Sequence, residues 1–356
     1  MRRLIIIYPP TIDWGWMKQR PQQLMTRLAR NGHTVFFCNP TRADRPIERI
    51  EPNLYVVHQY EQWLAGPWPE YRRNAGSHTK VVVWCSFPKL AASLQACKPD
   101  FIVYDCVDEF AQWQLYEPMM LRLADAVVCA SERLFYRMKR SCPDQKIHLI
   151  RNAYDTDMGL HVEAAVKNKY GLPGMAPLPP DLPENGLKRI GYIGAWAPWV
   201  DDALLRKLAD AIPEAELIII GPSFGKPYPR HVNNGRLRFL GLKYHGELPS
   251  YLEHLSVLLL PFRIEPITLS TNPVKLYEYL ATGKPVVSTA LPEAMQLVPE
   301  VDVALTHQAF ITKVLHRLRD PGSRSSRRAL ALQHTWEHRA SQVEIVLEQL
   351  QLSDRS

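Results

Sequence analysis

The stretch RIEPITLSTNPVKLYEYLATGKPVVST, residues 263–289, combines a loop, a short helix and a buried strand. The helix is predicted to begin at Asn272, because Ser270, Thr271 and Asn272 are all preferred N-cap residues. Pro273 fits the first helical position, where its missing N–H costs nothing. A helix start leaves unbonded N–H groups and carries the positive end of the helix dipole. The stretch therefore predicts an anion site, with phosphate as the ligand.

The end of this helix and two charged residues on it add to the prediction. Gly283 suits the left-handed conformation after the last turn, and Pro285 prevents the helix from continuing. Lys275 places a positive charge beside the helix start, and Glu278 follows about one turn later on the same face. Because most capped helices bind nothing, an ordinary helix with a Lys275–Glu278 surface pair is the alternative interpretation.

The composition is that of a soluble globular protein with room for two domains. The chain has 356 residues, of which 46% are hydrophobic and 22% are charged. No apolar run approaches the roughly 20 residues that a membrane-spanning helix needs. The N-terminal run to Tyr8 is too short for a signal peptide and is followed at once by Pro9 and Pro10, so it is interpreted as the first strand.

The cysteines indicate a reducing compartment. They include no Cys-x-x-Cys pair, and several lie inside apolar, strand-like runs; the six are Cys38, Cys85, Cys97, Cys106, Cys129 and Cys142. This pattern favours buried thiols over disulfides or a zinc site, and it predicts a cytoplasmic protein.

The net charge of +7 is concentrated in the first half of the chain. Residues 1–170 contain 23 Lys and Arg against 17 Asp and Glu. Such an excess favours an anionic partner, and peripheral contact with an anionic membrane on its inner face is one prediction. No nucleic-acid recognition motif accompanies the charge, so nucleic-acid binding is disfavoured. The alternative is that an excess of this size has no binding role.

Alternating strands and helices predict two doubly wound α/β domains. The strands expected in the first half are 4–8, 33–38, 54–58, 80–85, 101–104, 126–130 and 147–150. Those expected in the second half are 188–193, 217–220, 237–240, 256–261 and 286–289. Residues 171–186 contain five prolines and three glycines and are predicted to be a linker. The predicted domains are thus 1–170 and 187–334, with a final helix in 335–356.

The run from Asn272 to Thr289 closely resembles the donor-binding motif of bacterial nucleotide-sugar glycosyltransferases with the GT-B fold. The segments GYIGAW (191–196), IIGP (219–222), FLG (239–241) and LLLPFR (258–263) occur in the order seen in the donor domain of these enzymes. In the first half, WMKQRPQQLM (16–25) and YDCVDE (104–109) resemble a subgroup related to teichuronic-acid and exopolysaccharide glycosyltransferases. The resemblance implies an active site in the interdomain cleft and a C-terminal helix that packs on the first domain.

The resemblance also implies roles for residues of the second domain. Glu278 matches a glutamate that accepts hydrogen bonds from the ribose of the donor, and Lys275 and Arg263 are expected to contact its phosphates. The full set of expected donor-binding residues is Glu278, Lys275, Asn272, Pro273, Thr271, Ser270, Arg263, Gly194, Trp196 and Gly221. Ser270 departs from the pattern, because many retaining relatives carry a sugar-contacting glutamate at this position.

Candidate catalytic carboxylates are Asp13, Asp108 and Glu265. Asp13 and Asp108 follow predicted strands, where sites in parallel sheets lie, and an inverting transfer needs such a base. Asp108 has an alternative role as the cap of a following helix. No Asp-x-Asp motif lies in a suitable loop, so a metal-independent reaction without a cofactor is expected. The acceptor side is expected to use Trp14, Gly15, Trp16 and Arg20.

The predicted function is transfer of a sugar from a nucleoside-diphosphate sugar, with UDP as the expected nucleotide. The acceptor is expected to be a cell-envelope, polysaccharide or lipid-linked glycan. Two alternatives remain at this point: a sugar-nucleotide epimerase of the same fold, or a catalytically silent scaffold that binds nucleotide sugars.

Overall fold

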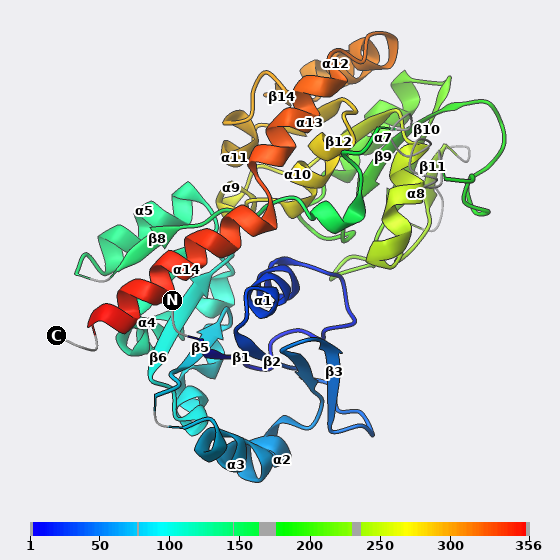
Figure 1. Ribbon diagram of the computed structural model, residues 1–356. Helices are drawn as coiled ribbons and strands as arrows, with labels where there is room; N and C mark the ends of the chain where they lie inside the picture. Colours follow the sequence, from blue (N-terminus) through cyan, green and yellow to red (C-terminus); the bar gives the residue numbers. More distant parts are fainter. Residues whose placement is uncertain (1–2, 77, 145, 164–175, 230–235, 354–356) are drawn as a thin grey trace. The chain divides into compact units, whose positions relative to one another are not determined.

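The computed structural model describes residues 3–76, 78–144, 146–163, 176–229 and 236–353 (Figure 1). The chain divides into two compact units. Unit 1 comprises Met1–Asn152, Ser270–Asn272 and Trp336–Ser356, and unit 2 comprises Ala153–Leu269 and Pro273–Thr335. The sequence boundary had been expected at 171–186, of which residues 171–175 lie outside the described part of the chain. The division in the structure comes earlier, between Asn152 and Ala153.

Unit 1 is built on a sheet with the strand order β3-β4-β2-β1-β5-β6-β7-β8 in its described residues. All neighbours in this order are parallel except β3 and β4, which form an antiparallel edge. The strands are β1 (Ile5–Tyr8), β2 (Thr34–Cys38), β3 (Ile47–Glu51), β4 (Leu54–Val57), β5 (Val81–Cys85), β6 (Phe101–Cys106), β7 (Ala126–Cys129) and β8 (Ile147–Leu149). Every residue of β1, β2, β5, β6 and β7 is buried, as expected for strands covered on both faces.

The helices of unit 1 follow the strands in the chain. They are α1 (Arg20–Arg30), α2 (Tyr60–Ala65), α3 (Pro67–Asn74), the 3₁₀ helices η1 (Pro88–Cys97) and η2 (Ala111–Trp113), α4 (Glu117–Leu123), α5 (Glu132–Ser141) and α14 (Trp336–Ser353). The last of these packs against α1, and an ion pair of 2.7 Å joins Arg27 of α1 to Glu337 of α14. The Ser131 side chain caps α5 by accepting a hydrogen bond from the N–H of Leu134, and serine is a preferred N-cap residue.

Unit 2 contains a parallel sheet with the order β11-β10-β9-β12-β13-β14 in its described residues. Its strands are β9 (Lys188–Ile193), β10 (Ala215–Ile220), β11 (Leu237–Phe239), β12 (Val257–Leu260), β13 (Val286–Thr289) and β14 (Val301–Ala304). The helices are η3 (Thr156–Met158), α7 (Asp202–Ala211), η5 (His245–Glu247), α8 (Leu248–Glu253), α9 (Pro266–Ser270), α10 (Val274–Ala281), α11 (Pro292–Met295), α12 (His307–Arg319) and α13 (Arg324–Gln333). Helix α10 packs against α13 and against strand β13, and both helices are labelled in Figure 1.

The strands predicted from apolar runs are present in the structure, with ends that differ by at most two residues. The predicted cap of α10 is wrong. That helix begins at Val274 with Pro273 as its N-cap residue, and no side chain caps it. The Asn272 side chain instead accepts a hydrogen bond of 3.1 Å from the N–H of Asn152, 120 positions earlier in the chain. The side-chain oxygen of Asn272, which the sequence pattern assigns to the cap of α10, thus satisfies the buried N–H of Asn152 instead.

Candidate functional site

The carboxyl ends of the parallel strands in unit 2 bring several predicted residues to one edge of the sheet. Gly194 directly follows β9, Gly221 directly follows β10, and Arg263 lies three residues after β12. Because β9 pairs with β10 and β12 in parallel, their carboxyl ends lie at the same edge. Ligand sites of open α/β sheets lie at this edge. The structure therefore gathers these three residues where a ligand site is expected.

Gly194 and Gly221 allow two backbone segments to approach closely at this edge. The N–H of Gly194 donates to the carbonyl of Ile220 over 2.7 Å. A Cβ atom added to Gly221 would lie 2.1 Å from the carbonyl oxygen of Gly194. Both glycines also have positive φ angles, +153° at Gly194 and +145° at Gly221. Side chains are excluded here by both space and backbone conformation.

Lys275 occupies the space that the missing side chain of Gly194 leaves. A Cβ atom at Gly194 would lie 2.6 Å from Cε and Nζ of Lys275. The ammonium group lies 5.5 Å from the ring centroid of Tyr192 and 5.4 Å from that of Phe262, so both aromatic rings help to hold it. Lys275 is the second residue of α10, so its charge adds to the positive end of that helix. The site thus concentrates positive potential beside the Gly194 backbone.

Glu278 lies one turn further along α10 and is buried, with 8% of its surface exposed. Burial raises the pKa of the nearby Tyr154 phenol, and the Asp155 and Glu278 carboxylates raise it further. The Tyr154 hydroxyl lies 3.0 Å from Nδ1 of His161 and accepts a hydrogen bond from the N–H of Leu160. Glu278 is therefore set in an ordered part of unit 2, on the same short helix as Lys275.

Arg263 and Trp196 occupy different environments. Arg263 is half-exposed and donates to Asp202 over 2.8 Å, and Lys226 lies 3.0 Å from the same carboxylate. Burial alone would raise the pKa of Asp202, but these two cations outweigh it and lower that pKa. Trp196 is 1% exposed and donates from its indole nitrogen to the carbonyl of Pro227. We therefore assign Trp196 to core packing, which corrects the expectation that its ring contacts a ligand.

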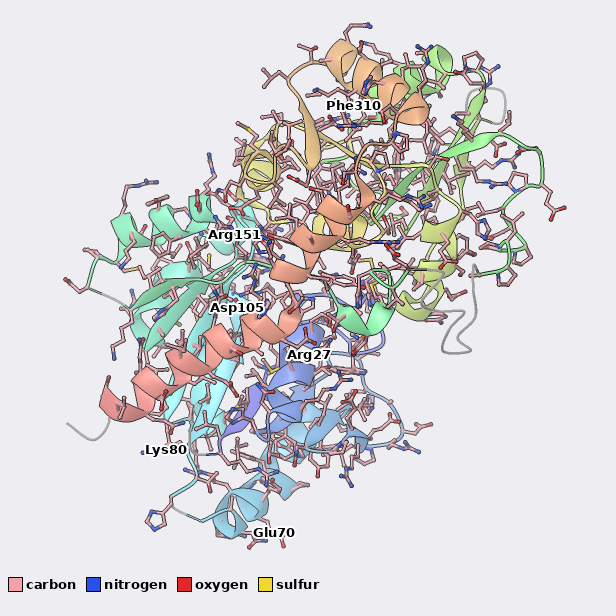
Figure 2. All side chains as sticks on the ribbon, turned by 45° about the horizontal axis from the view of Figure 1, so that its top comes forward. Arg27, Glu70, Lys80, Asp105, Arg151 and Phe310 are labelled. Carbon is pink, nitrogen blue, oxygen red and sulfur yellow. The ribbon has the colours of Figure 1, made fainter. Side chains whose placement is uncertain are left out.

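Arg20 belongs to a buried network in unit 1. Its guanidinium makes contacts of 2.9–3.0 Å with both carboxylate oxygens of Asp105, a residue of β6 that is labelled in Figure 2. It also donates to the carbonyl of Ile150 and the side chain of Asn152. Asp105 is fully buried and accepts a further hydrogen bond from Trp84. The predicted acceptor-side role of Arg20 is replaced by a structural one.

The other acceptor-side residues lie in the loop after β1. The N–H of Trp14 donates to Asn39, and its ring packs edge-on against Phe37 at 5.1 Å. Trp16 is 45% exposed, and no atom lies within 4 Å of a Cβ built at Gly15. This loop therefore presents one open aromatic ring to solvent.

The candidate carboxylates differ in what they bind. Both oxygens of Asp13 accept hydrogen bonds from Thr41, at 3.0 Å from its N–H and 2.6 Å from its hydroxyl. Glu265 begins the turn before α9, where its N–H donates to the hydroxyl of Thr268. Asp108 does not cap a helix, because the N-cap residue of η2 is Phe110 and that of α4 is Tyr116. The capping alternative for Asp108 is thus removed.

The structure also identifies a carboxylate that the sequence did not single out. Residues 270–272 belong to unit 1, and the hydroxyl of Ser270 donates to Glu109. Glu109 also pairs with Arg133 at 3.4 Å and Arg137 at 3.8 Å, two residues of α5. In the same segment, Thr271 contacts Asp108 at 3.4 Å. The sequence signal for such an acidic partner is the spacing of Arg133 and Arg137, which lie four positions apart and therefore on one face of a helix.

Among the described residues, no group of three or more His, Cys, Asp or Glu side chains is arranged to bind a metal ion. No helix in the described part of the chain has both the length and the apolar character needed to cross a membrane.

Comparisons with known proteins agree with this architecture. Residues 188–320 match the family model for glycosyl transferases group 1. The chain is 24% identical over 393 aligned positions to TuaH of Bacillus subtilis (strain 168), a protein assigned as a teichuronic acid biosynthesis glycosyltransferase; the match covers 94% of each chain.

Solved structures share the fold over almost the entire chain. Sucrose-phosphate synthase from Thermosynechococcus elongatus superposes with a TM-score of 0.71 and 16% identity, covering 99% of this chain and 100% of the other. HepE from Anabaena, solved in complex with UDP-glucose, gives a TM-score of 0.64 and 13% identity, with coverage of 98% and 100%. The chain thus carries a domain that matches glycosyl transferases group 1 at residues 188–320, and it shares the two-unit α/β GT-B fold of these solved glycosyltransferases.

Proposed function

We propose that this enzyme transfers a sugar from a UDP-linked donor to a polysaccharide or lipid-linked acceptor of the cell envelope. The observation that carries the donor half is the position of the Lys275 ammonium group, which fills the space left by the absent side chain of Gly194 at the carboxyl edge of the unit 2 sheet. HepE, which shares the fold, was solved with UDP-glucose, and TuaH is assigned to teichuronic acid biosynthesis. These relatives support the choice of donor and of acceptor class.

The diphosphate of the donor would lie against the start of α10. An anion there meets the positive end of the helix dipole and the Lys275 ammonium group. Gly194 has no side chain that would keep the phosphates from this ammonium. As the bond from the sugar to the diphosphate breaks, negative charge grows on the leaving group. Fixed positive charge at that point lowers the barrier.

Arg263 is a second source of positive charge for the leaving diphosphate. Its partner Asp202 is shared with Lys226, so the carboxylate keeps a cation when Arg263 turns away. An ion pair at a half-exposed arginine contributes about 1 kcal/mol or less, so a diphosphate can compete for the guanidinium. Arg263 also suits the task because its planar fork can bind two phosphate oxygens at once.

Glu278 would bind the ribose of the nucleotide. The Glu278 residue is 8% exposed and lies on the same helix as Lys275, three positions further on. A carboxylate accepts hydrogen bonds from two neighbouring hydroxyls, which is the pattern that a ribose presents. The resemblance of this helix to the donor-binding motif supports the same role.

For acid–base chemistry we propose Asp108 before Asp13 and Glu265. Both oxygens of Asp13 already accept hydrogen bonds from Thr41, which fixes that carboxylate in its loop. Asp108 follows the buried strand β6 and caps no helix. A base that removes the proton of an acceptor hydroxyl needs a carboxylate of this kind within hydrogen-bond reach.

A donor screen tests the proposed function. The purified chain is incubated with UDP-, GDP- and dTDP-linked sugars, with and without EDTA, and release of free nucleotide diphosphate is measured. We expect slow release from one UDP-sugar, no loss with EDTA, and a marked fall in Lys275→Ala but not in Lys207→Ala, which removes an exposed lysine of α7. Isomerised sugar would identify an epimerase instead. Tight binding without turnover, even with acceptor glycans present, would identify a silent scaffold.

A further inference from the structure

An exposed apolar surface lies on unit 1, after strand β6. Its most exposed residues are Leu115 at 85%, Met119 at 43% and Tyr116 at 41%. Tyr116 is the N-cap residue of α4 and Met119 lies in its first turn, while Leu115 lies just before the helix. Large side chains exposed together in this way on a soluble protein usually mark a surface that meets another partner. We call Leu115, Tyr116 and Met119 the α4 surface.

Two cations border the α4 surface. The Lys89 ammonium lies 5.3 Å from the ring centroid of Tyr116 and 5.9 Å from that of Phe87. Arg122 is exposed and lies three positions after Met119 on α4, so both residues share one side of that helix. The apolar residues and both positive charges therefore belong to one continuous part of unit 1.

Acidic residues are scarce in the segments that carry these cations. Between Phe110 and Ala124 the one acidic residue is Glu117, which is 8% exposed and bound by Arg137 and Tyr104. Lys89 is the one charged residue in η1, the helix against which α4 packs. The α4 surface thus combines exposed apolar groups with net positive charge.

The location of this surface matches a role at a membrane. It follows the carboxyl end of β6, and the loop after β1, which carries the exposed Trp16, leaves the same edge of the sheet. Aromatic rings with polar atoms favour the interface between water and lipid, while leucine and methionine enter the outer acyl region. An anionic bilayer also attracts nearby lysine and arginine.

We propose that the α4 surface, with Lys89 and Arg122, binds the enzyme peripherally to an anionic lipid bilayer. A soluble glycan fits this surface poorly. Its hydroxyl groups would lose water against Leu115 and Met119 without gaining hydrogen bonds in return. The inference goes beyond sugar transfer, and vesicle binding can be measured without any donor. Its failure would therefore leave the proposed transferase function untouched, and the reverse also holds.

The test is co-sedimentation of the full chain with phosphatidylcholine vesicles. One set of vesicles also contains about 30 mol% phosphatidylglycerol, which makes it anionic. We expect binding to the anionic vesicles alone, with weaker binding as salt is raised. Leu115→Ser combined with Met119→Ser should lower the partition coefficient at least tenfold. Lys89→Gln and Arg122→Gln should each lower it about fivefold.

A matched control is available in unit 2. Leu305 is 83% exposed, close to the 85% of Leu115, and Leu305→Ser should leave vesicle binding unchanged. Circular dichroism and the thermal midpoint establish that each variant is folded. The proposal is overturned if the wild-type chain does not bind anionic vesicles, or if the Leu115 and Leu305 variants bind alike. It is also overturned if charge variants alone lose binding, or if an anionic polysaccharide is bound in place of vesicles.

Discussion

Lys275 places its ammonium where a side chain at Gly194 would otherwise project, since a Cβ atom there would lie 2.6 Å from Nζ. The two residues come from different elements, the turn after β9 and the first turn of α10. Their relationship explains why a glycine and a lysine 81 positions apart act together in the proposed site. A positive charge is held beside the Gly194 backbone, with the aromatic rings of Tyr192 and Phe262 near it.

The first prediction concerns Gly194. Gly194→Ala should displace the Lys275 side chain and strain the backbone, whose φ of +153° suits glycine. We expect the affinity for UDP to fall about tenfold, because a charged hydrogen bond contributes about 1.5–3 kcal/mol. Isothermal titration calorimetry measures this. Gly246→Ala is the control, since nothing lies within 4 Å of its added Cβ. Equal UDP affinities for the two variants would contradict the prediction.

The second prediction separates the roles of Lys275 and Glu278. Lys275→Met should weaken binding of both UDP and inorganic diphosphate by about ten- to a hundredfold, because it removes a charge-assisted contact. Glu278→Gln should weaken binding of UDP but not of inorganic diphosphate, because that carboxylate is assigned to the ribose. Competition calorimetry with the two ligands measures this. Loss of diphosphate binding in Glu278→Gln would show that the assignment of the ribose contact is wrong.

The third prediction concerns the buried pair in unit 1. Arg20→Met should lower the free energy of unfolding by about 3–5 kcal/mol, because Asp105 is left as an uncompensated buried charge. Arg45→Met removes an arginine that is 67% exposed and should change stability by less than about 0.5 kcal/mol. Urea denaturation measures both. If Arg20→Met altered acceptor use with unchanged stability, the sequence-based role of Arg20 would be restored.

The fourth prediction is a pH dependence of stability. The Lys284 ammonium donates to the carbonyls of Glu253 and Leu255. Burial lowers its pKa to about 8, and the nearby Arg324 and Arg328 act in the same direction. The ordinary lysine value is about 10.4, so between these two pH values the unfolded chain holds a proton that the folded chain has lost. Stability should therefore rise with pH in this window, by up to about 1.4 kcal/mol per unit.

Comparison with Lys284→Met isolates this contribution from other titrating groups. The free energy of unfolding is measured in urea at about pH 8 and about pH 9.5, which span most of the window between the two pKa values. The wild-type chain should gain stability relative to the variant as the pH rises. Parallel pH profiles for the two proteins would contradict a lowered pKa at Lys284.

The parallel sheets were predictable because their strands are buried on both faces. Runs such as 81–85 and 217–220 contain almost nothing but apolar residues, and few other structures accept such runs. Helix α1 has clear local signals at both ends, because Pro21 lies in its first turn and Asn31-Gly32 follows its last. Local signals and tertiary burial agree in these segments.

The elements that sequence reasoning missed depend on distant contacts. Helices α2 and α3 are placed by Trp63 and Trp68, which pack at 5.1 and 6.2 Å from Phe36 of β2. Strand β3 is mostly charged, is largely exposed and pairs with one neighbour, so it lacks the apolar run of the others. No periodicity within these short segments encodes such partners.

The site was predicted unevenly for the same reason. Lys275, Gly194 and Gly221 were proposed because the motifs fix their positions, and the structure places the Lys275 ammonium beside Gly194. Trp196 was given a ligand role, although its indole is held in the core by Pro227. Glu109 was missed because its partners Ser270 and Arg137 are remote in sequence.

The most direct test of the donor site is a crystal structure of the enzyme with UDP-glucose. We predict that an oxygen of the diphosphate lies about 3 Å from Nζ of Lys275, with the ribose hydroxyls at Glu278. The same soak of Lys275→Met should show weaker or no nucleotide density. A nucleotide bound away from the start of α10, with Lys275 in no contact with it, would contradict the account.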